Sequence, residues 1–384
     1  MRRGYADLPL HGGHVPPWLL ARMRRMARIV VALVVEEHGG VGLLERLADP
    51  FWFQALNNII GMDWDSSGST TVTTAVIREA LAGGDLGVYA AGGKGERSRR
   101  APDEIRQAAE KAGLPAEELV AASRLAAKAD NTALQDGYQL YHHAFFFDEE
   151  GHWAVVQQGM SQRRRMARRY HWFSREPRFP ELRHHSGIAG LRERLVLNTL
   201  DEEASRHRRA LLDLVGEKPS AIESELRSLE ALAEGYRPLA YYTPYTPEEA
   251  RRLVERYRAL GPLRLNRAAL EAARETGPRS YGELLSTPGL GPSTLRALSL
   301  VAELVYEEPP SWRDPVTHPS DPFRYAYAVG GKDGVPFPVD REFYDEVLSL
   351  LERLAGETGD RRLLRLLARM SRGWEPPPWG KRPT

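Results

Sequence analysis

Two stretches in the middle of the chain, residues 138–147 and 153–158, are dense in aromatic and β-branched side chains. Such residues favour β-strands, and the Asp-Glu-Glu-Gly segment at 148–151 has the composition of a hairpin turn. The pattern predicts a β-hairpin. A shorter strand is expected at 86–91, where it enters a Gly-Gly-Lys-Gly turn. That turn does not match the phosphate loop of nucleotide hydrolases, so it gives no support to nucleotide hydrolysis.

The polar residues of this hairpin gather at its open end, away from the turn. If Phe147 lies opposite Trp153, the two histidines of the first strand face the two glutamines of the second, within one residue of register. We call this group, with the two aspartates that precede the first strand, the hairpin root: Asp130, Asp136, His142, His143, Gln157 and Gln158.

Helical periodicity dominates elsewhere. A buried helix is expected over 18–38, between Pro16-Pro17 and Gly39-Gly40, and four more before the hairpin. The periodicity of residues 201–306 is helical throughout, and after a Pro-rich connection two final helices are expected. The predicted fold class is a mixed α/β unit (1–200), an all-α helix-hairpin-helix unit (201–308), and an extended segment with C-terminal helices (309–384).

The helix-hairpin-helix prediction rests on residues 281–306, where Pro-Gly-Leu-Gly-Pro-Ser separates two amphipathic segments. Glycines let a backbone approach a phosphate closely, and the free N–H groups at the start of a helix bind it. Contacts of this kind reach the sugar-phosphate backbone, so they predict binding without sequence specificity. The residues expected to anchor a phosphate are Gly289, Gly291, Thr294 and Arg296. The alternative is an ordinary pair of helices with a glycine turn.

A basic element follows the hairpin directly. Residues 161–175 contain six arginines and no acid, interleaved with four aromatic rings. We expect a basic helix here, in which arginine binds phosphate and the aromatic rings stack on bases. A solvated charged surface is the equal alternative. The arginines expected to grip a strand are Arg163, Arg164, Arg165, Arg168 and Arg169.

The hairpin root has two interpretations. Its side chains either hydrogen-bond one another inside the protein or hold a divalent metal. The layout of an aspartate, two strands and a basic element resembles that of PD-(D/E)xK nucleases, in which Asp and Glu hold Mg²⁺ and a lysine handles the attacking water. Here Gln-Gln-Gly-Met stands where an acid and a lysine are expected. The metal hypothesis assigns catalytic roles to Asp136, His142, His143 and Gln158, and metal ligation (Mg²⁺ or Mn²⁺) to Asp136, His142 and Asp63.

Composition limits these hypotheses without choosing between them. The 384 residues are 42% hydrophobic and carry a formal charge of +1, so a polyanion site requires local clustering of cations. The absence of cysteine excludes disulfides and thiolate metal sites. The apolar run at 29–35 is too short to cross a membrane and ends in two glutamates. We expect a cytoplasmic protein that does not bind membranes, and its Arg, Glu and Pro content is typical of thermophiles.

Several longer segments, among them "DPFWFQALNNIIGMDWDSSGSTT", "ALQDGYQLYHHAFFFDEEGHWAVVQQGM" and "AVGGKDGVPFPV", resemble the bacterial and archaeal family catalogued as domain of unknown function 763. The resemblance spans roughly residues 1–350 and implies no activity.

The residues favour a DNA-binding protein, with metal-dependent cleavage of the phosphodiester backbone as the further hypothesis. A non-catalytic DNA-binding or DNA-repair accessory protein is the alternative, and an RNA-processing enzyme is a weaker one, since backbone contacts do not choose DNA over RNA. Single- and double-stranded DNA both stay open, as does a homodimer.

Overall fold

The computed structural model describes residues 8–9, 15–62, 67–174, 185–236 and 245–319, with 342, 345, 347–349 and 351. Its main sheet is antiparallel, with strand order β1-β6-β5-β4-β2, and β7 also pairs with β6. The strands are β1 (Leu8–Pro9), β2 (Val88–Lys94), β4 (Gln139–Asp148), β5 (Trp153–Ser161), β6 (Met166–Phe173) and β7 (Gly187–Ala189). A separate short pair joins β3 (Leu134–Gln135) and β8 (Leu197–Asn198).

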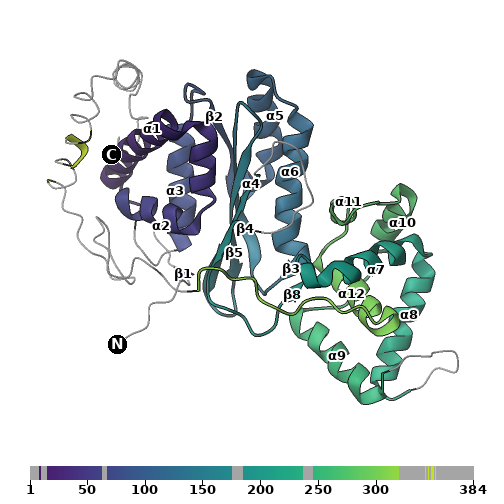
Figure 1. The fold of residues 1–384 in the computed structure, drawn as a ribbon. Coiled ribbons are helices and arrows are strands. Elements are labelled where there is room, and N and C mark those ends of the chain that lie inside the picture. The colour runs from purple at the N-terminus through teal and green to yellow at the C-terminus, as the bar shows by residue number, and fades with distance from the viewer. Residues whose placement is uncertain are drawn as a thin grey trace, which may run out of the picture.

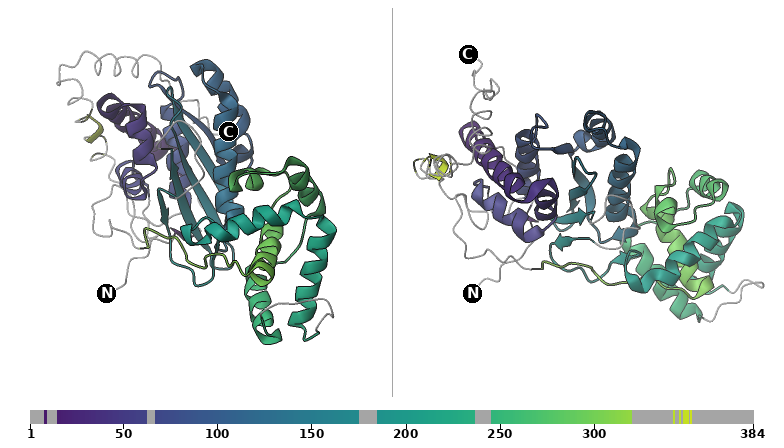
Figure 2. Two further views of the ribbon diagram at one scale, coloured as in Figure 1. Left: turned by 45° about the vertical axis from the view of Figure 1, so that its right-hand side comes forward. Right: turned by 45° about the horizontal axis from the view of Figure 1, so that its top comes forward.

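Helices cover both faces of this sheet. One layer contains α1 (Pro17–Leu47), α2 (Pro50–Ile59) and α3 (Ser67–Ala80), and the other contains α5 (Ala101–Ala112) and α6 (Ala116–Lys128), with the short α4 (Glu96–Arg99) leading into α5. Figures 1 and 2 show the sheet between these two layers. The fold is therefore mixed α/β, as the sequence predicts.

The predicted hairpin is confirmed together with its register. Phe147 pairs with Trp153, His142 with Gln158 and His143 with Gln157. Successive side chains of a strand point to opposite faces, so Phe145 and Phe147 pack toward α5 and α6, whereas Phe146 packs toward α1. All three phenylalanines are fully buried. Burial of such a side chain contributes roughly 1.5–3 kcal/mol, which fixes the register strongly.

Two helix boundaries differ in detail from the expectation. The helix expected to end at Gly39 does break there, at a left-handed φ of 73°, but the chain re-enters helix and continues to Leu47. After α6 the chain makes one wider turn, η1 (Ala129–Ala133), a π-helix. This turn carries the buried Asp130 of the hairpin root.

The basic helix expected at 161–175 is wrong. Residues 162–165 form the turn between β5 and β6, and residues 166–173 are strand β6. The sequence Arg-Arg-Tyr-His-Trp-Phe alternates between the two faces of the sheet, and each face is buried under a helical layer. Cross-strand pairing and burial therefore outweigh the helix-forming tendency of arginine.

The described residues between 205 and 306 are helical or loop, and these helices lie beside α6 (Figure 1). They are α7 (Ser205–Gly216), α8 (Pro219–Ala233), α9 (Pro247–Leu260), α10 (Arg267–Thr276), α11 (Tyr281–Ser286) and α12 (Pro292–Tyr306), preceded by the 3-10 turn η2 (Glu202–Ala204). The apolar faces of α7, α8, α9 and α12 join the same core as the α5 and α6 side of the sheet.

After α12 the chain returns to the sheet. We call residues 307–319 the strap. It forms isolated bridges from Ser311 to Asn198 and from His318 to Ala189. The two helices expected near 341–356 and 360–372 lie almost wholly outside the described residues.

Candidate functional site

The hairpin root is divided between the two faces of the sheet. His142 and His143 are neighbours on β4, so their side chains point in opposite directions. Their partners on β5, Gln158 and Gln157, are divided in the same way. The two histidines therefore belong to two separate polar clusters.

The cluster under α3 contains His142. Its Nε2 lies 3.0 Å from the Thr74 hydroxyl, and Gln158 donates to Thr70 at 3.0 Å. Tyr141 donates to the Gln158 carbonyl at 2.5 Å. Burial lowers the pKa of His142 to about 3, so the ring is neutral at physiological pH. Arg169 of β6 reaches Gln54 of α2 at 3.2 Å on this side.

The cluster under α6 contains His143. Its Nδ1 donates to the Gln157 carbonyl at 2.8 Å, because that oxygen can only accept, which leaves Nε2 to accept from Ser123 at 2.7 Å. Gln157 in turn donates to Asp130 at 2.5 Å. Asp130 also accepts from the Trp172 indole at 2.9 Å and contacts His185. Burial lowers the pKa of His143 as well.

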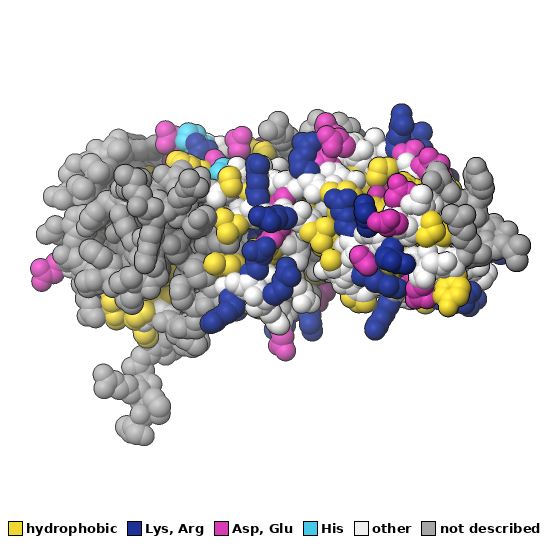
Figure 3. Space-filling model, turned by 90° about the horizontal axis from the view of Figure 1, so that it is seen from below, with side chains coloured by type: hydrophobic (Ala, Val, Ile, Leu, Met, Phe, Trp, Pro, Cys, Tyr) yellow, Lys and Arg dark blue, Asp and Glu magenta, His cyan; other side chains and the backbone are white. Residues whose placement is uncertain are grey.

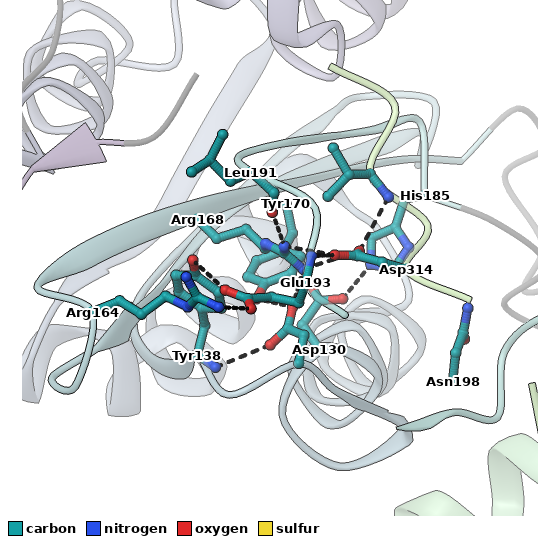
Figure 4. Close-up of polar contacts among 12 residues, drawn as sticks. Asp130, Tyr138, Arg164, Arg168, Tyr170, His185, Leu191, Glu193, Asn198 and Asp314 are labelled. Carbon is teal, nitrogen blue, oxygen red and sulfur yellow. Dashed lines mark hydrogen bonds and ion pairs between the residues drawn. The ribbon is translucent and has the colours of Figure 1, made fainter. Parts of the chain in front are cut away.

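Asp136 lies beyond this cluster and is held by donors of the chain. Its Oδ2 accepts from Arg168 and from the Tyr170 hydroxyl, each at 2.7 Å, and its Oδ1 accepts from the Tyr138 backbone at 3.0 Å. Arg168 also binds Asp314 of the strap, at 2.8 and 3.1 Å (Figure 4). Burial by itself lowers the pKa of Arg168, but the neighbouring carboxylates outweigh it and the pKa is raised. The guanidinium therefore stays charged between two aspartates.

This geometry places the predicted metal ligands apart. Asp136 contacts Tyr170, which packs with the core on the α6 side, whereas His142 contacts α3 on the other side. Both Asp136 oxygens already accept hydrogen bonds from the chain. Within the described ranges there is no group of three or more His, Asp or Glu side chains that could hold a metal ion. Asp63 lies outside the described residues.

The arginine run is divided by the start of β6. Arg163, Arg164 and Arg165 lie in the exposed β5–β6 turn, with Arg165 in a left-handed conformation at φ 55°. Arg168 and Arg169 are 0% and 2% exposed. Of the five arginines expected to grip a nucleic acid, only the three in the turn are presented to solvent.

Three more exposed arginines lie next to this turn. Glu193 forms an ion pair with Arg164 at 2.5 Å, and its backbone N–H donates to Asp314 at 2.5 Å. The turn, residues 190–196 and the strap are therefore adjacent. Arg192 donates to the strap carbonyl of Val316 at 3.3 Å. We call the exposed set the arginine surface: Arg163, Arg164, Arg165, Arg192, Arg194 and Arg313.

Two carboxylates adjoining this surface point inward. The side chain of Glu193 is 8% exposed and that of Asp314 only 3%. Exposed acids also lie near this surface: Glu203, which pairs with Arg313 at 2.6 Å, and its neighbour Glu202. Figure 3 shows Lys and Arg side chains gathered on the face seen from below, with fewer acidic ones at its centre. Local clustering thus produces a positive surface on a chain of net charge +1.

The turn between α11 and α12 has some of the expected features. Gly289 is exposed with a left-handed φ of 77°, and a Cβ there would lie 2.9 Å from Asn266. Gly291 precedes α12 with φ −118° and open space around its Cβ position. Thr294 and Arg296, however, are buried inside the chain.

The burial of these two side chains has a local cause. Residues 261–266 cross the start of α12, and Thr294 donates to the Arg264 carbonyl at 3.2 Å. Arg296 donates to Pro262 and to Gln135, both at 2.8 Å. In this conformation neither side chain is presented to a phosphate.

Some residues of the buried cluster around Arg168 and of the arginine surface were not predicted from the sequence. Asp314 and Tyr170 hold Arg168 and Asp136, and Arg192 and Arg194 extend the arginine surface. The aromatic residues at 170, 172 and 173 are typical of strands, but the arginines beside them tolerate a helix equally well. No local pattern could have paired Arg168 with a residue 146 positions away.

The fold and these clusters define a mixed α/β protein with two buried polar clusters on its sheet and an arginine-rich surface. Residues 4–339 match the family described as "Protein of unknown function (DUF763)", and the chain belongs to this family, as the resemblance indicated. Comparisons with curated proteins and with solved structures gave no match. No helix in the described part of the chain is both long enough and apolar enough to cross a bilayer.

Proposed function

We propose that this protein binds DNA through its phosphate backbone and without sequence specificity. The arginine surface supports this proposal most directly, because its six exposed arginines come from three adjacent segments, the β5–β6 turn, residues 190–196 and the strap, while the neighbouring Glu193 and Asp314 point inward. Arginine is suited to bidentate contacts with phosphate oxygens. Contacts of this kind position a protein on a nucleic acid and carry no sequence information.

The turn before α12 is a second proposed contact, in the manner of a helix-hairpin-helix. Gly291 has room beside it, no side chain caps the start of α12, and Pro292 begins the helix. Backbone N–H groups at such a start bind anions with the help of the helix dipole. In this proposal the α/β part carries the arginine surface and the all-α part after residue 204 carries the turn.

The test is direct binding of labelled DNA by fluorescence anisotropy. Affinity should fall steeply as salt rises from about 50 to about 200 mM and should vary little between unrelated sequences, because the contacts displace counterions from phosphates. Salt-insensitive binding, strong preference for one sequence, or no binding would each contradict the proposal.

Metal-dependent cleavage is a separate proposal and carries less support. The carboxylate assigned to the metal, Asp136, is held by Arg168 and Tyr170. Incubating supercoiled, linear and single-stranded DNA with the protein and Mg²⁺ or Mn²⁺ tests it. A wild type that cuts no form in either metal would leave the DNA-binding accessory protein as the account of this chain.

A further inference from the structure

The arginine run appeared in the sequence as a mixture of two binding chemistries. Its arginines suit phosphate, and its aromatic rings suit stacking on unpaired bases. The structure separates the two. Tyr170 and His171 are 0% exposed and Trp172 is 2% exposed, because all three lie within β6 between helical layers. The fourth ring, Phe173, is half-buried and packs against the core on the α1 side. Among the described residues of the run, the exposed arginines are those of the turn, so phosphate binding remains and stacking is removed.

Two aromatic rings that adjoin the arginine surface, Tyr138 and Trp312, are also occupied. Tyr138 is 5% exposed and lies under the Arg168 guanidinium, 4.7 Å from its centre. Trp312, next to Arg313 on the strap, is covered by Arg256 at 3.7 Å and meets the edge of Tyr257. Neither ring can accept a base without breaking these contacts.

The exposed aromatic rings lie elsewhere. Among the described residues they are Phe51 on α2, Tyr236 after α8 and Tyr306 at the end of α12. Tyr306 has acidic neighbours, since Glu217, Glu225 and Asp213 add to the effect of burial in raising its pKa. A surface of that charge repels a polyanion.

We infer that the arginine surface recognises double-helical DNA rather than single strands. This inference rests on the proposed function and specifies its substrate. Proteins that hold single strands combine cations with aromatic platforms on which bases stack, and the described part of this surface offers the cations alone. A duplex keeps its bases stacked internally and presents phosphates at fixed spacing, so it needs no such platform.

The experiment compares three labelled probes at one salt concentration: a DNA duplex of roughly two helical turns, about 20 base pairs, an unstructured oligothymidine with the same number of phosphates, and an RNA duplex of the same sequence. The DNA duplex should bind at least about tenfold more tightly than the single strand, since stacking supplies much of single-strand affinity. The inference would be overturned by equal or tighter binding of the single strand, or by tighter binding of the RNA duplex. Binding of none of the three would instead overturn the proposed function itself.

A variant that restores stacking makes the comparison sharper. Gln162 is exposed in the same turn, beside Arg163. Gln162→Trp adds an aromatic platform without removing a cation, so single-strand affinity should rise several-fold while duplex affinity changes little. Gln162→Leu is the matched control for added apolar surface and should leave both affinities unchanged. Wild-type single-strand affinity that already equals that of Gln162→Trp would contradict the inference.

Discussion

The arginine run contains two groups that differ in solvent exposure. Arg163, Arg164 and Arg165 form the first group, and Arg168 and Arg169 form the second. The first three lie in an exposed turn, and the last two are buried in the sheet between helical layers. Arg168 holds two carboxylates inside the protein, whereas the exposed Arg164 pairs with one glutamate, Glu193. A run that reads as one basic element is therefore two elements, one that stabilises the fold and one available to a ligand.

The same comparison explains the hairpin root. A charged or polar group that a strand points inward must find partners, because an unsatisfied buried group is costly. Asp136, Gln157 and His143 all have such partners, so their chemistry is used by the fold. Polar residues are available for function where the strand ends, as in the β5–β6 turn.

The largest effect is a loss of stability, expected when Arg168 in the buried part of the arginine run is replaced. Arg168→Met leaves Asp136 and Asp314 buried without their cation, and removing one partner of a buried ion pair costs about 3–5 kcal/mol. Urea unfolding should show this loss, while Arg165→Asn, which suits the left-handed φ at that position, should change stability by less than about 0.5 kcal/mol. Equal losses of stability in the two variants would contradict the division of the arginine run into a structural part and an exposed part. If Arg168→Met does not fold, Asp314→Asn provides a milder version of the same test.

Asp136→Asn should cost less, about 1–3 kcal/mol, because Arg168 keeps Asp314 as a partner. The amide also places a donor near the Tyr138 N–H or the Arg168 guanidinium. Thermal melting distinguishes this structural role from metal binding, since a ligand bound only by the folded state raises the melting temperature. Because donors of the chain already occupy both Asp136 oxygens, Asp136→Asn should leave any Mn²⁺-dependent rise unchanged. A rise that the variant abolishes would restore Asp136 as a metal ligand.

Acid should destabilise the interior through its histidines. The pKa of His142 is about 3 in the fold and near 6.5 when unfolded, so the unfolded state binds more protons between these values. Stability is then complete above the unfolded pKa and is lost as pH falls below it, by about 2 kcal/mol at about pH 5. His142→Gln should remove that share of the pH dependence measured by urea unfolding at neutral and acidic pH. An unchanged pH dependence in the variant would mean that the ring is accessible to protons in the fold.

The smallest effect is a loss of DNA affinity, expected from a substitution in the turn before α12, the second proposed contact. Gly291→Val should fold normally, because its φ of −118° suits any residue and nothing lies within 4 Å of the added Cβ. DNA affinity should fall several-fold for all sequences alike if a phosphate approaches this backbone. Gly289→Val is the contrasting variant, since its φ of 77° and the nearby Asn266 predict loss of stability instead. Unchanged affinity in Gly291→Val would remove the turn from the binding surface.

Local patterns were sufficient to predict a large part of this fold. Segments rich in aromatic and β-branched residues on either side of Asp148–Gly151 predicted the hairpin and its register, and the Pro16-Pro17 and Gly39 signals predicted the bounds of the first helical segment. The metal hypothesis could have been tested by the same alternation, because His142 and His143 cannot share a face of one strand.

Other features depend on distant parts of the chain. Asp314 becomes a partner of Arg168 only because the strap returns to β6 after the helices, and Arg296 is buried only because residues 261–266 cross α12. Residues 161–173 contain arginine, which tolerates helix well, and only burial on both faces decides in favour of a strand. Tertiary contacts of this kind leave no signature within a short window.

The central claim, that the exposed half of the arginine run binds phosphate, is tested most directly by the salt dependence of DNA affinity. The turn variant combines Arg163→Gln, Arg164→Gln and Arg165→Asn. The control combines Arg99→Gln, Arg106→Gln and Lys111→Gln on α4 and α5, which pack against the edge strand β2, separated from β6 by β4 and β5. Both variants lose three positive charges, so the comparison tests whether the position of those charges matters.

Duplex affinity is measured for both variants and the wild type between about 50 and about 200 mM salt. Each lost phosphate contact reduces the magnitude of the slope of log K against log salt by about 0.9. The slope of the turn variant should therefore be smaller in magnitude by about 2–3, and its affinity at low salt should fall at least about tenfold. The control should keep the wild-type slope. A turn variant with the wild-type slope, or a control that loses as much, would contradict the account.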